Sequence, residues 1–535
     1  MSKREQNLTQ AGTILLLSAI IVKLIGALFK IPLSSVYALG DLGFGYFSAV
    51  YDLYTPIYTL ALSGFPVAIA KITADITSKN DINSEARLHF SALKLVFLIG
   101  IIVTFLFCAI TFPMILLQSE NKSAVFGIIA IAPSVIICSL VSVYRGYFEG
   151  RKNMFPPAIS NIIEALGKLV LGLLGAIITI KLTKNPALAS AAALLGITIG
   201  TVVSLIYIKL RYNKDNRFAC VSDENKKYHS GMRKELLAII IPVAIASLSM
   251  GIVGLIDSVT LRPLLTSLLQ NESEYGEILL AGTSYKDVGI SEIPTIIYGI
   301  KSKAHTLFHL APTLTMAFGI GAVPLVTHYF AVNDRKNVKN NVDSCLKFSA
   351  VLSMPIALGC AFLSFGIMTL LFSDLSATLG GRILQIYSVA SLFAALTIPT
   401  TALLQGISRQ KEALISIGTG IILKLILNFV LVPTISFNVY GAVIASVVCF
   451  GVTFILNLLF LIKGLGFVPD IMGSIIKPLI AALICTIAAH FIGNAIQTSF
   501  GTVLAICCAG VIYIILILLL KVITLKDAKE LFKMN

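Results

Sequence analysis

Charged side chains are scarce in this chain of 535 residues, because Asp, Glu, Lys and Arg make up 13% of it and hydrophobic residues 57%. Soluble domains contain about 25% charged residues, so this composition excludes a water-soluble fold of this size. It also excludes disordered, collagen-like and coiled-coil chains. The nine cysteines are scattered through apolar stretches without a C-x-x-C pair. This pattern argues against a disulfide framework and against a zinc site.

Signatures of soluble chemistry are also missing. Gly167–Lys168 is followed by Leu169, so the chain has no Walker A motif, and it has no H-E-x-x-H. No connector is long enough for a nucleotide-binding domain, so we expect neither an enzyme nor an ATP-driven pump. We expect no metal and no cofactor, and leave open only a coupling ion such as Na+, H+ or Cl−. The net charge of +15 lies mainly in connectors, which argues against a nucleic-acid partner.

Long apolar runs fill the chain. A membrane-spanning helix needs about 20 apolar residues, and the sequence holds about fourteen such runs. They predict an all-α polytopic membrane protein. The runs lie at approximately 11–36, 46–76, 90–117, 124–147, 157–181, 187–209, 236–262, 299–330, 345–372, 383–406, 413–433, 439–462, 474–493 and 501–523.

The connectors predict an orientation. Lys and Arg are concentrated in alternate connectors, above all in 209–235, and basic connectors are typical of the cytoplasmic side. Both termini are therefore expected in the cytoplasm. The first run contains two lysines and is too long for a cleavable signal peptide. The tail KVITLKDAKELFKMN fits either an amphipathic helix on the inner surface or a solvated end.

An internal repeat is visible at an offset of about 256 residues, as in many duplicated transporters. The aligned pairs are Glu149 and Gln405, Gly150 and Gly406, Lys168 and Lys424, and Pro56 and Pro312. We predict two related six-helix lobes with two helices appended, a design that suits alternating access. The predicted parts are an N-lobe at 1–212, a basic linker at 213–235, a C-lobe at 236–463 with an outside loop at 263–298, and helices 13–14 with the tail at 464–535.

Ionisable residues inside the apolar runs point to a binding site. A charge in hydrocarbon costs at least about 2.5–3.5 kcal/mol, so it usually faces a partner or a water-filled cavity. Lys23 and Lys30 are seven residues apart on one face of the first helix. Asp52 on the second helix is expected to pair with one of them, as a structural ion pair or as a switch. Beside it, a stripe of Tyr51, Tyr54 and Tyr58 fits packing, an interfacial belt or a sugar platform.

The eighth helix carries a second polar stripe. Lys301, His305 and His309 recur every four residues, which places them on one face. Two histidines without a carboxylate partner make a poor metal site. We therefore expect this stripe to line the central, substrate-binding cavity together with Lys23, Lys30 and Asp52.

Further ionisable residues fit either a coupling role or structural pairing. Glu164 and Lys168 have the i, i+4 spacing that favours an ion pair on one helix. Lys424 and Asn428 repeat this spacing without an acid. Asp257 fits either a pair with Arg262 or a site for a coupling cation or proton.

Basic residues outnumber acidic ones inside the runs, and this excess indicates an anionic substrate. Phosphate is the favoured group, because lysine binds it as a point charge. A cation-coupled multidrug exporter would instead depend on Asp52, Glu164 and Asp257. A non-transporting scaffold protein is a third alternative, although a scaffold need not tolerate the cost of buried charges.

Three stretches carry a family resemblance. They are the opening GTILLLSAIIVKLIGALFKIPLSSVYALGDLGFGYFSAVYDLYTPIYTLALSGFPVAIAK, YRGYFEGRKNMFPPAISNIIEALGKL at 144–169, and its repeat partner LLQGISRQKEALISIGTGIILKLILN at 403–428. All three resemble bacterial polysaccharide-biosynthesis membrane proteins of the SpoVB and MurJ kind. The outside connector and the eighth helix are similar as well. The resemblance implies a member of the multidrug/oligosaccharidyl-lipid/polysaccharide (MOP) exporter superfamily with fourteen helices in two lobes.

The resemblance also implies a function. Such a protein flips an undecaprenyl-pyrophosphate-linked saccharide across the bacterial cytoplasmic membrane, lipid II or another polysaccharide unit, in peptidoglycan synthesis or sporulation. The protein is expected to be a monomer. Its implied partners are this substrate and membrane lipids, and cell-wall synthesis enzymes are an open alternative. Those flippases place basic residues of helices 1, 2 and 8 in a central cavity. This chain departs from them in having Asp52 on helix 2, with Lys71 only toward its inner end, and lysine where arginine is common.

Overall fold

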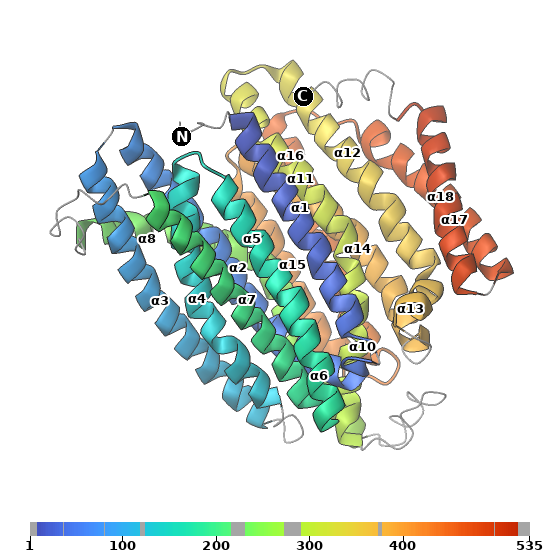
Figure 1. The fold of residues 1–535 in the computed structure, drawn as a ribbon. Helices are drawn as coiled ribbons and strands as arrows, with labels where there is room; N and C mark the ends of the chain where they lie inside the picture. The colour runs from blue at the N-terminus through green and yellow to red at the C-terminus, as the bar shows by residue number, and fades with distance from the viewer. Residues whose placement is uncertain are drawn as a thin grey trace. The chain divides into compact units, whose positions relative to one another are not determined.

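A computed structural model describes residues 8–35, 37–79, 81–117, 124–215, 230–271, 290–372, 377–496 and 498–522. These residues form helices without any β-strand (Figure 1). In this described part, 13 helices are long and apolar enough to cross a membrane. Together with the 26-residue first helix, they confirm the all-α polytopic fold of about 14 spans. Much of the predicted basic linker, outside loop and tail, at 216–229, 272–289 and 523–535, lies outside the described residues.

The helices of the first half follow the apolar runs closely. A π-helical turn, η2, interrupts the fifth predicted span, between α5 and α6. The elements are α1 (Leu8–Leu33), α2 (Gly40–Ser78), α3 (Ile82–Leu117), α4 (Val125–Gly150), α5 (Phe155–Gly167), η2 (Lys168–Gly172), α6 (Leu173–Thr183), α7 (Pro186–Asp215) and α8 (Ser230–Asn271).

The second half contains two further interruptions. The eighth predicted span is divided between α10 and α11, and the ninth between α12 and α13. The elements are η3 (Ile290–Glu292), α10 (Ile293–Phe308), α11 (Leu310–Ala331), α12 (Arg335–Phe362), α13 (Ser364–Phe372), α14 (Ala377–Gly406), α15 (Gln410–Leu431), α16 (Asn438–Leu465), η5 (Met472–Ile476), α17 (Lys477–Ala495) and α18 (Ser499–Leu519).

Local chemistry explains several helix ends. Asp334 caps α12 by accepting a 3.1 Å hydrogen bond from the backbone N–H of Asn337, and such hydrogen bonds hold the pKa of its carboxyl below the usual value. Thr498 caps α18 in the same way through Gly501. The α16 helix stops at Gly466, which has a φ of +70°, a left-handed conformation that glycine adopts at little cost.

The chain divides into two compact units. Unit 1 contains Met1–Val259 and Ser291–Gly299, and unit 2 contains Thr260–Ile290 and Ile300–Asn535. Each unit has its own buried apolar core, with Phe29, Phe47 and Val50 in unit 1 and Met354, Leu396 and Ala481 in unit 2. The narrower lobe bounds expected from the sequence stay a prediction.

Helix packing within each unit follows the internal repeat. In unit 1, α4 packs against α2 and α7, and α5 packs against α7. In unit 2, α14 packs against α11 and α16, and α15 packs against α16. The aligned glycines Gly150 and Gly406 are the last residues of α4 and α14, so the repeat relates helices that occupy corresponding places in their own units.

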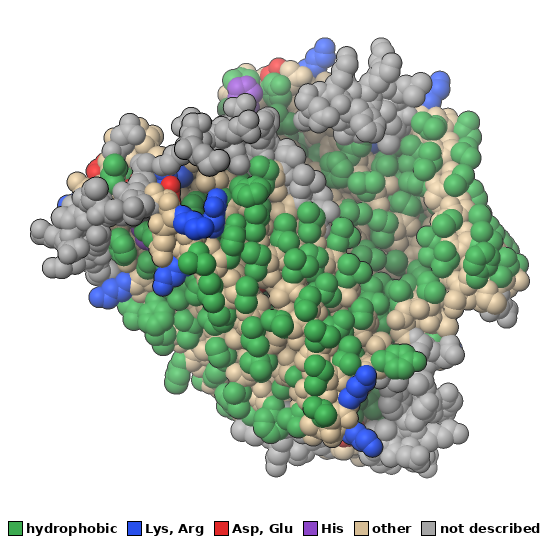
Figure 2. Space-filling view, in the orientation of Figure 1, with side chains coloured by type: hydrophobic (Ala, Val, Ile, Leu, Met, Phe, Trp, Pro, Cys, Tyr) green, Lys and Arg blue, Asp and Glu red, His purple; other side chains and the backbone are tan. Residues whose placement is uncertain are grey.

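Large apolar side chains cover much of the exterior. The face drawn in Figure 2 is mainly hydrophobic, and its Lys and Arg side chains lie toward the margins. Phe105 on α3 is 71% exposed and Ile514 on α18 is 62% exposed. A soluble protein would bury such residues, whereas a bilayer solvates them.

Candidate functional site

Three tyrosines form a continuous stripe on α2. Tyr51, Tyr54 and Tyr58 are three and four residues apart, which places them on one face of the helix. Their ring centroids lie 6.2 Å apart for Tyr51 and Tyr54 and 5.5 Å apart for Tyr54 and Tyr58. Phe47 extends the stripe by stacking on Tyr51 at 5.2 Å. The stripe contacts side chains of both α1 and α5.

Two lysines from different helices converge on Tyr51. The Nζ of Lys168, in η2, donates a 2.7 Å hydrogen bond to the phenol oxygen of Tyr51 and lies 4.5 Å from its ring centroid. The Nζ of Lys30, near the end of α1, lies 4.9 Å from the same centroid. Lys168 is also 5.2 Å from the ring centroid of Phe29. Cations at these distances are attracted by the negative ring faces.

Lys23 completes what we call the Tyr51 cluster, defined as Lys23, Lys30, Lys168 and Tyr51. Lys23 lies two turns before Lys30 on α1, is exposed, and interacts electrostatically with the other three members. Among the described residues, no carboxylate lies within ion-pair distance of these three lysines. The cluster therefore gathers positive charge from α1 and η2 on one face of α2.

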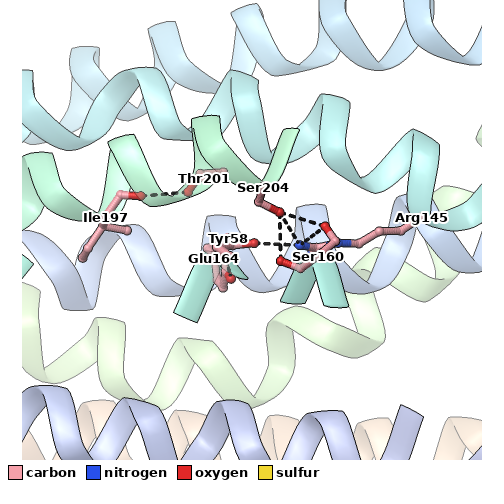
Figure 3. Close-up of polar contacts among 7 residues, drawn as sticks. All are labelled: Tyr58, Arg145, Ser160, Glu164, Ile197, Thr201 and Ser204. Carbon is pink, nitrogen blue, oxygen red and sulfur yellow. Dashed lines mark hydrogen bonds and ion pairs between the residues drawn. The ribbon is translucent and has the colours of Figure 1, made fainter. Parts of the chain in front are cut away.

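Glu164 is neutralised by an arginine that sequence reasoning missed. Its Oε2 lies 2.8 Å from the Nη2 of Arg145 on α4, and its Oε1 accepts a 2.5 Å hydrogen bond from Tyr58. Arg145 also donates to the hydroxyls of Ser160, at 3.0 Å, and Ser204, at 3.2 Å. Figure 3 shows this network, in which the Glu164 carboxylate binds both Tyr58 and Arg145.

This network takes the place of the structural pair with Lys168, which was one of the two alternatives that the sequence left open for Glu164. A Glu–Lys pair at i, i+4 stabilises a helix by only about 0.2–0.5 kcal/mol, whereas a buried guanidinium offers a charge-assisted hydrogen bond. The π-helical turn that begins at Lys168 also alters the spacing on which the expected pair depends. Arg145 lies at the end of an apolar run, and that position was the available signal.

Asp52 has a different partner from the one expected. Its Oδ2 accepts a 2.7 Å hydrogen bond from the hydroxyl of Tyr298 on α10, in place of an ion pair with Lys23 or Lys30. Consecutive residues on an α-helix point about 100° apart, so Asp52 faces a different neighbour from Tyr51. Asp257, on α8, is buried, with 2% of its surface exposed.

In unit 2, the predicted stripe on α10 gathers around an aromatic ring of α14. The Nζ of Lys301 lies 5.7 Å from the ring centroid of Tyr387, and the His305 ring lies 5.5 Å from it. The rings of His305 and His309 are 4.5 Å apart. Lys301 is buried, His305 is half-buried and His309 is exposed. The structure thus brings the three predicted residues together.

The break between α10 and α11 is a consequence of Pro312. A proline ring clashes with the carbonyl four residues earlier and has no N–H to offer it. Here that carbonyl belongs to Phe308, the last residue of α10. It accepts a 2.6 Å hydrogen bond from the hydroxyl of Ser391 on α14. The freed backbone oxygen therefore ties α10 to α14 close to His305 and His309.

The repeat partner of Lys168 has a different environment. Lys424 is fully buried and donates a 2.7 Å hydrogen bond to the hydroxyl of Ser446 on α16. Asn428 is equally buried and donates to the hydroxyl of Thr260 at 2.9 Å. Both side chains bind neighbouring elements inside unit 2, whereas Lys168 is half-buried at the edge of the Tyr51 cluster.

Across the described ranges, no group of three or more His, Cys, Asp or Glu side chains is arranged to hold a metal ion.

Two family models match the chain. The model described as "Polysaccharide biosynthesis protein" matches residues 8–270, and the MatE model matches residues 299–430. The matched segments cover most of the helices of both units.

Three proteins of Bacillus subtilis (strain 168) are similar over most of the length. An uncharacterized membrane protein, YabM, is 28% identical over 84% of this chain and 79% of its own. The lipid II flippase MurJ is 25% identical over 81% and 78%. Stage V sporulation protein B is 24% identical over 96% and 95%.

Solved structures share the fold at low sequence identity. A lipid II flippase MurJ in an inward closed conformation superposes with a TM-score of 0.67 at 15% identity, over 94% of this chain and 97% of the other. An inward-facing multidrug resistance MATE transporter gives 0.64 at 14% identity, over 85% and 98%. The family models, the relatives and the shared fold agree with the resemblance found in the sequence. The chain therefore belongs to the multidrug/oligosaccharidyl-lipid/polysaccharide exporter superfamily, as a multi-pass membrane transporter or flippase and not an enzyme.

Proposed function

We propose that this protein translocates an undecaprenyl-pyrophosphate-linked saccharide, of the lipid II kind, across the bacterial cytoplasmic membrane by alternating access. The observation that carries the proposal is the Tyr51 cluster, in which Lys30 and Lys168 lie against one phenol ring and Lys23 interacts with them electrostatically, without a carboxylate at ion-pair distance among the described residues. Its anion-binding chemistry suits the pyrophosphate of such a substrate.

The burial cost of charge supports this interpretation. Each lysine in a membrane-spanning segment costs at least about 2.5–3.5 kcal/mol to insert, and three that lie close together also repel one another. Packing alone would be better served by apolar residues. Binding of an anionic ligand would offset both the insertion cost and the repulsion between the lysines. Phosphate suits this role, because an ammonium binds it well as a point charge.

The similarity to flippases supports the choice of a lipid-linked substrate. Two relatives are described as a lipid II flippase and a stage V sporulation protein, and the first family model is that of polysaccharide biosynthesis proteins. We expect a monomer with both termini in the cytoplasm and a cycle driven by an ion gradient, the membrane potential or substrate flow.

The second candidate is a cation-coupled multidrug exporter, which the MatE match at 299–430 favours. Such a protein would use exposed acids in its cavity. Here Glu164 is engaged by Arg145 and Tyr58, and Asp52 is engaged by Tyr298. Because both acids already have partners, these contacts argue for the anionic substrate.

Complementation tests the proposal. Lys23→Ala and Lys30→Ala are expected to abolish growth of a strain depleted of its lipid II flippase, while the wild-type chain supports growth and protein levels are equal. The control Lys181→Ala removes an exposed lysine at the end of α6 and should leave growth intact. Full growth with both cluster variants would refute the site, and drug sensitivity on deletion would favour the exporter.

A further inference from the structure

The π-helical turn η2 brings glycines of two helices into register. Hydrogen bonds in a π-turn span one residue more than in an α-helix, and such turns are frequent at functional sites. Gly167 and Gly172 border η2 five residues apart, whereas Gly196 and Gly200 on α7 are four residues apart. The extra residue of the π-turn allows Gly167 to meet Gly200 and Gly172 to meet Gly196 where η2 crosses α7.

The two backbones touch at this crossing. A Cβ added to Gly196 would lie 2.3 Å from the backbone nitrogen of Gly172, and one added to Gly167 would lie 2.5 Å from the Cα of Gly200. A Cβ on Gly200 would lie 2.9 Å from the backbone nitrogen of Lys168. Side chains larger than hydrogen would separate the helices. The glycines therefore fix the place from which the Lys168 side chain starts.

Two hydrogen bonds hold the same segment against the tyrosine stripe of α2. Tyr58 donates to Glu164 at 2.5 Å, and Lys168 donates to Tyr51 at 2.7 Å. Because Arg145 already neutralises Glu164, the charge of Lys168 is not cancelled by the acid on its own helix. The segment therefore adds one net positive charge to Lys23 and Lys30.

From this geometry we infer that Lys168 is a third phosphate-binding cation, and that Tyr51 is the residue that positions it. An ammonium has three N–H donors, and one of them is used by Tyr51, which leaves two for phosphate oxygens. Tyr51 accepts this hydrogen bond, and no described residue accepts its own O–H, so that proton is available to the same anion. The inference rests on the proposed function and adds η2 to the helices that hold the substrate.

Binding of undecaprenyl pyrophosphate to the purified full-length protein, measured by native mass spectrometry in detergent, tests this inference. Lys168→Met and Lys30→Ala are each expected to weaken binding about tenfold or more, the loss that corresponds to one charge-assisted hydrogen bond. Lys168→Arg retains the charge and should stay within about threefold of wild type, and Tyr51→Phe should weaken binding about threefold to tenfold. Lys181→Ala is the matched lysine control.

The outcomes separate the two claims. If Lys30→Ala weakens binding and Lys168→Met does not, the inference is overturned and the proposed function stands. If neither weakens binding, or if the wild-type protein does not bind the probe, the proposed function fails as well. If Lys168→Met does not fold, the Lys168→Arg and Tyr51→Phe variants decide. The inference is supported if Lys168→Arg still binds undecaprenyl pyrophosphate and Tyr51→Phe binds it more weakly than wild type. Unchanged binding by Tyr51→Phe overturns the role of that tyrosine.

Discussion

Lys168 donates a 2.7 Å hydrogen bond to Tyr51 of α2 instead of pairing with Glu164, which lies four residues earlier in the chain. Glu164 is held by Arg145 of α4 at 2.8 Å. This exchange of partners has an electrostatic consequence. A helix segment that would have been neutral contributes a positive charge to the cluster of Lys23 and Lys30.

Arg145→Ala is expected to destabilise the protein strongly. The substitution leaves the Glu164 carboxylate buried without its counter-charge, and breaking a buried ion pair in this way costs about 3–5 kcal/mol. Unfolding of the purified protein in detergent, followed by heat or by SDS titration, measures the loss.

The control for this experiment is the half-exposed pair of Arg409 and Glu412, 2.9 Å apart. Arg409→Ala should cost no more than about 1 kcal/mol, because exposed pairs contribute little. Replacing both buried partners, as Arg145→Met with Glu164→Leu, should recover much of the stability. Equal losses for Arg145→Ala and Arg409→Ala would contradict the importance given to the network in Figure 3.

Gly196→Ala is expected to separate α7 from η2. The new Cβ would meet the backbone nitrogen of Gly172 at 2.3 Å, and overpacking of this kind costs about 1–3 kcal/mol. Because η2 carries Lys168, the variant should lose transport activity even where enough of the protein stays folded to support growth. Complementation and thermal unfolding of the same variant measure the two effects.

Gly418→Ala is the matched helix-interior control, since a Cβ there would meet nothing within 4 Å. It should stay within about 1 kcal/mol of wild type, with any change favouring alanine. If Gly196→Ala matches Gly418→Ala in both complementation and thermal unfolding, the close contact between α7 and η2 is needed for neither transport nor stability.

Ser391 and Pro312 should be energetically coupled. Ser391→Ala removes the donor to the Phe308 carbonyl, which Pro312 has deprived of its helical partner, and the loss of one such hydrogen bond costs about 0.5–1.5 kcal/mol. In a Pro312→Ala background the carbonyl regains a backbone N–H, so Ser391→Ala should cost less. A double-mutant cycle on unfolding in detergent measures the coupling, and strict additivity would argue against this account of the break.

The membrane fold could be predicted because it depends on local composition. Runs of about 20 apolar residues dictate spanning helices wherever the backbone has no water to bind. The interruption after Phe308 depends on the neighbouring hydroxyl of Ser391 as well as on Pro312. The π-turn packs closely against Gly196 and Gly200 of another helix. A single helical segment does not contain that information.

The residues of the candidate site could be predicted better than their partners. Lys23, Lys30 and Lys301 were selected as candidates because charge is expensive in a membrane, and their role in binding stays a prediction. For Glu164 the sequence left a structural pair with Lys168 and a coupling role open, and it missed Arg145, because sequence spacing identifies neighbours on the same helix only. Arg145 lies 19 residues away on a different helix, and only packing of α4 against α5 brings it to Glu164.

The most direct test of the central claim is the accessibility of lipid II in the outer leaflet of cells depleted of their own flippase. We predict that the wild-type chain restores access from outside, and that the Lys23→Ala, Lys30→Ala double variant, at equal protein level, leaves lipid II in the inner leaflet. Restored access with that double variant, or no restoration by the wild-type chain, would contradict the claim that the Tyr51 cluster holds a pyrophosphate-linked substrate.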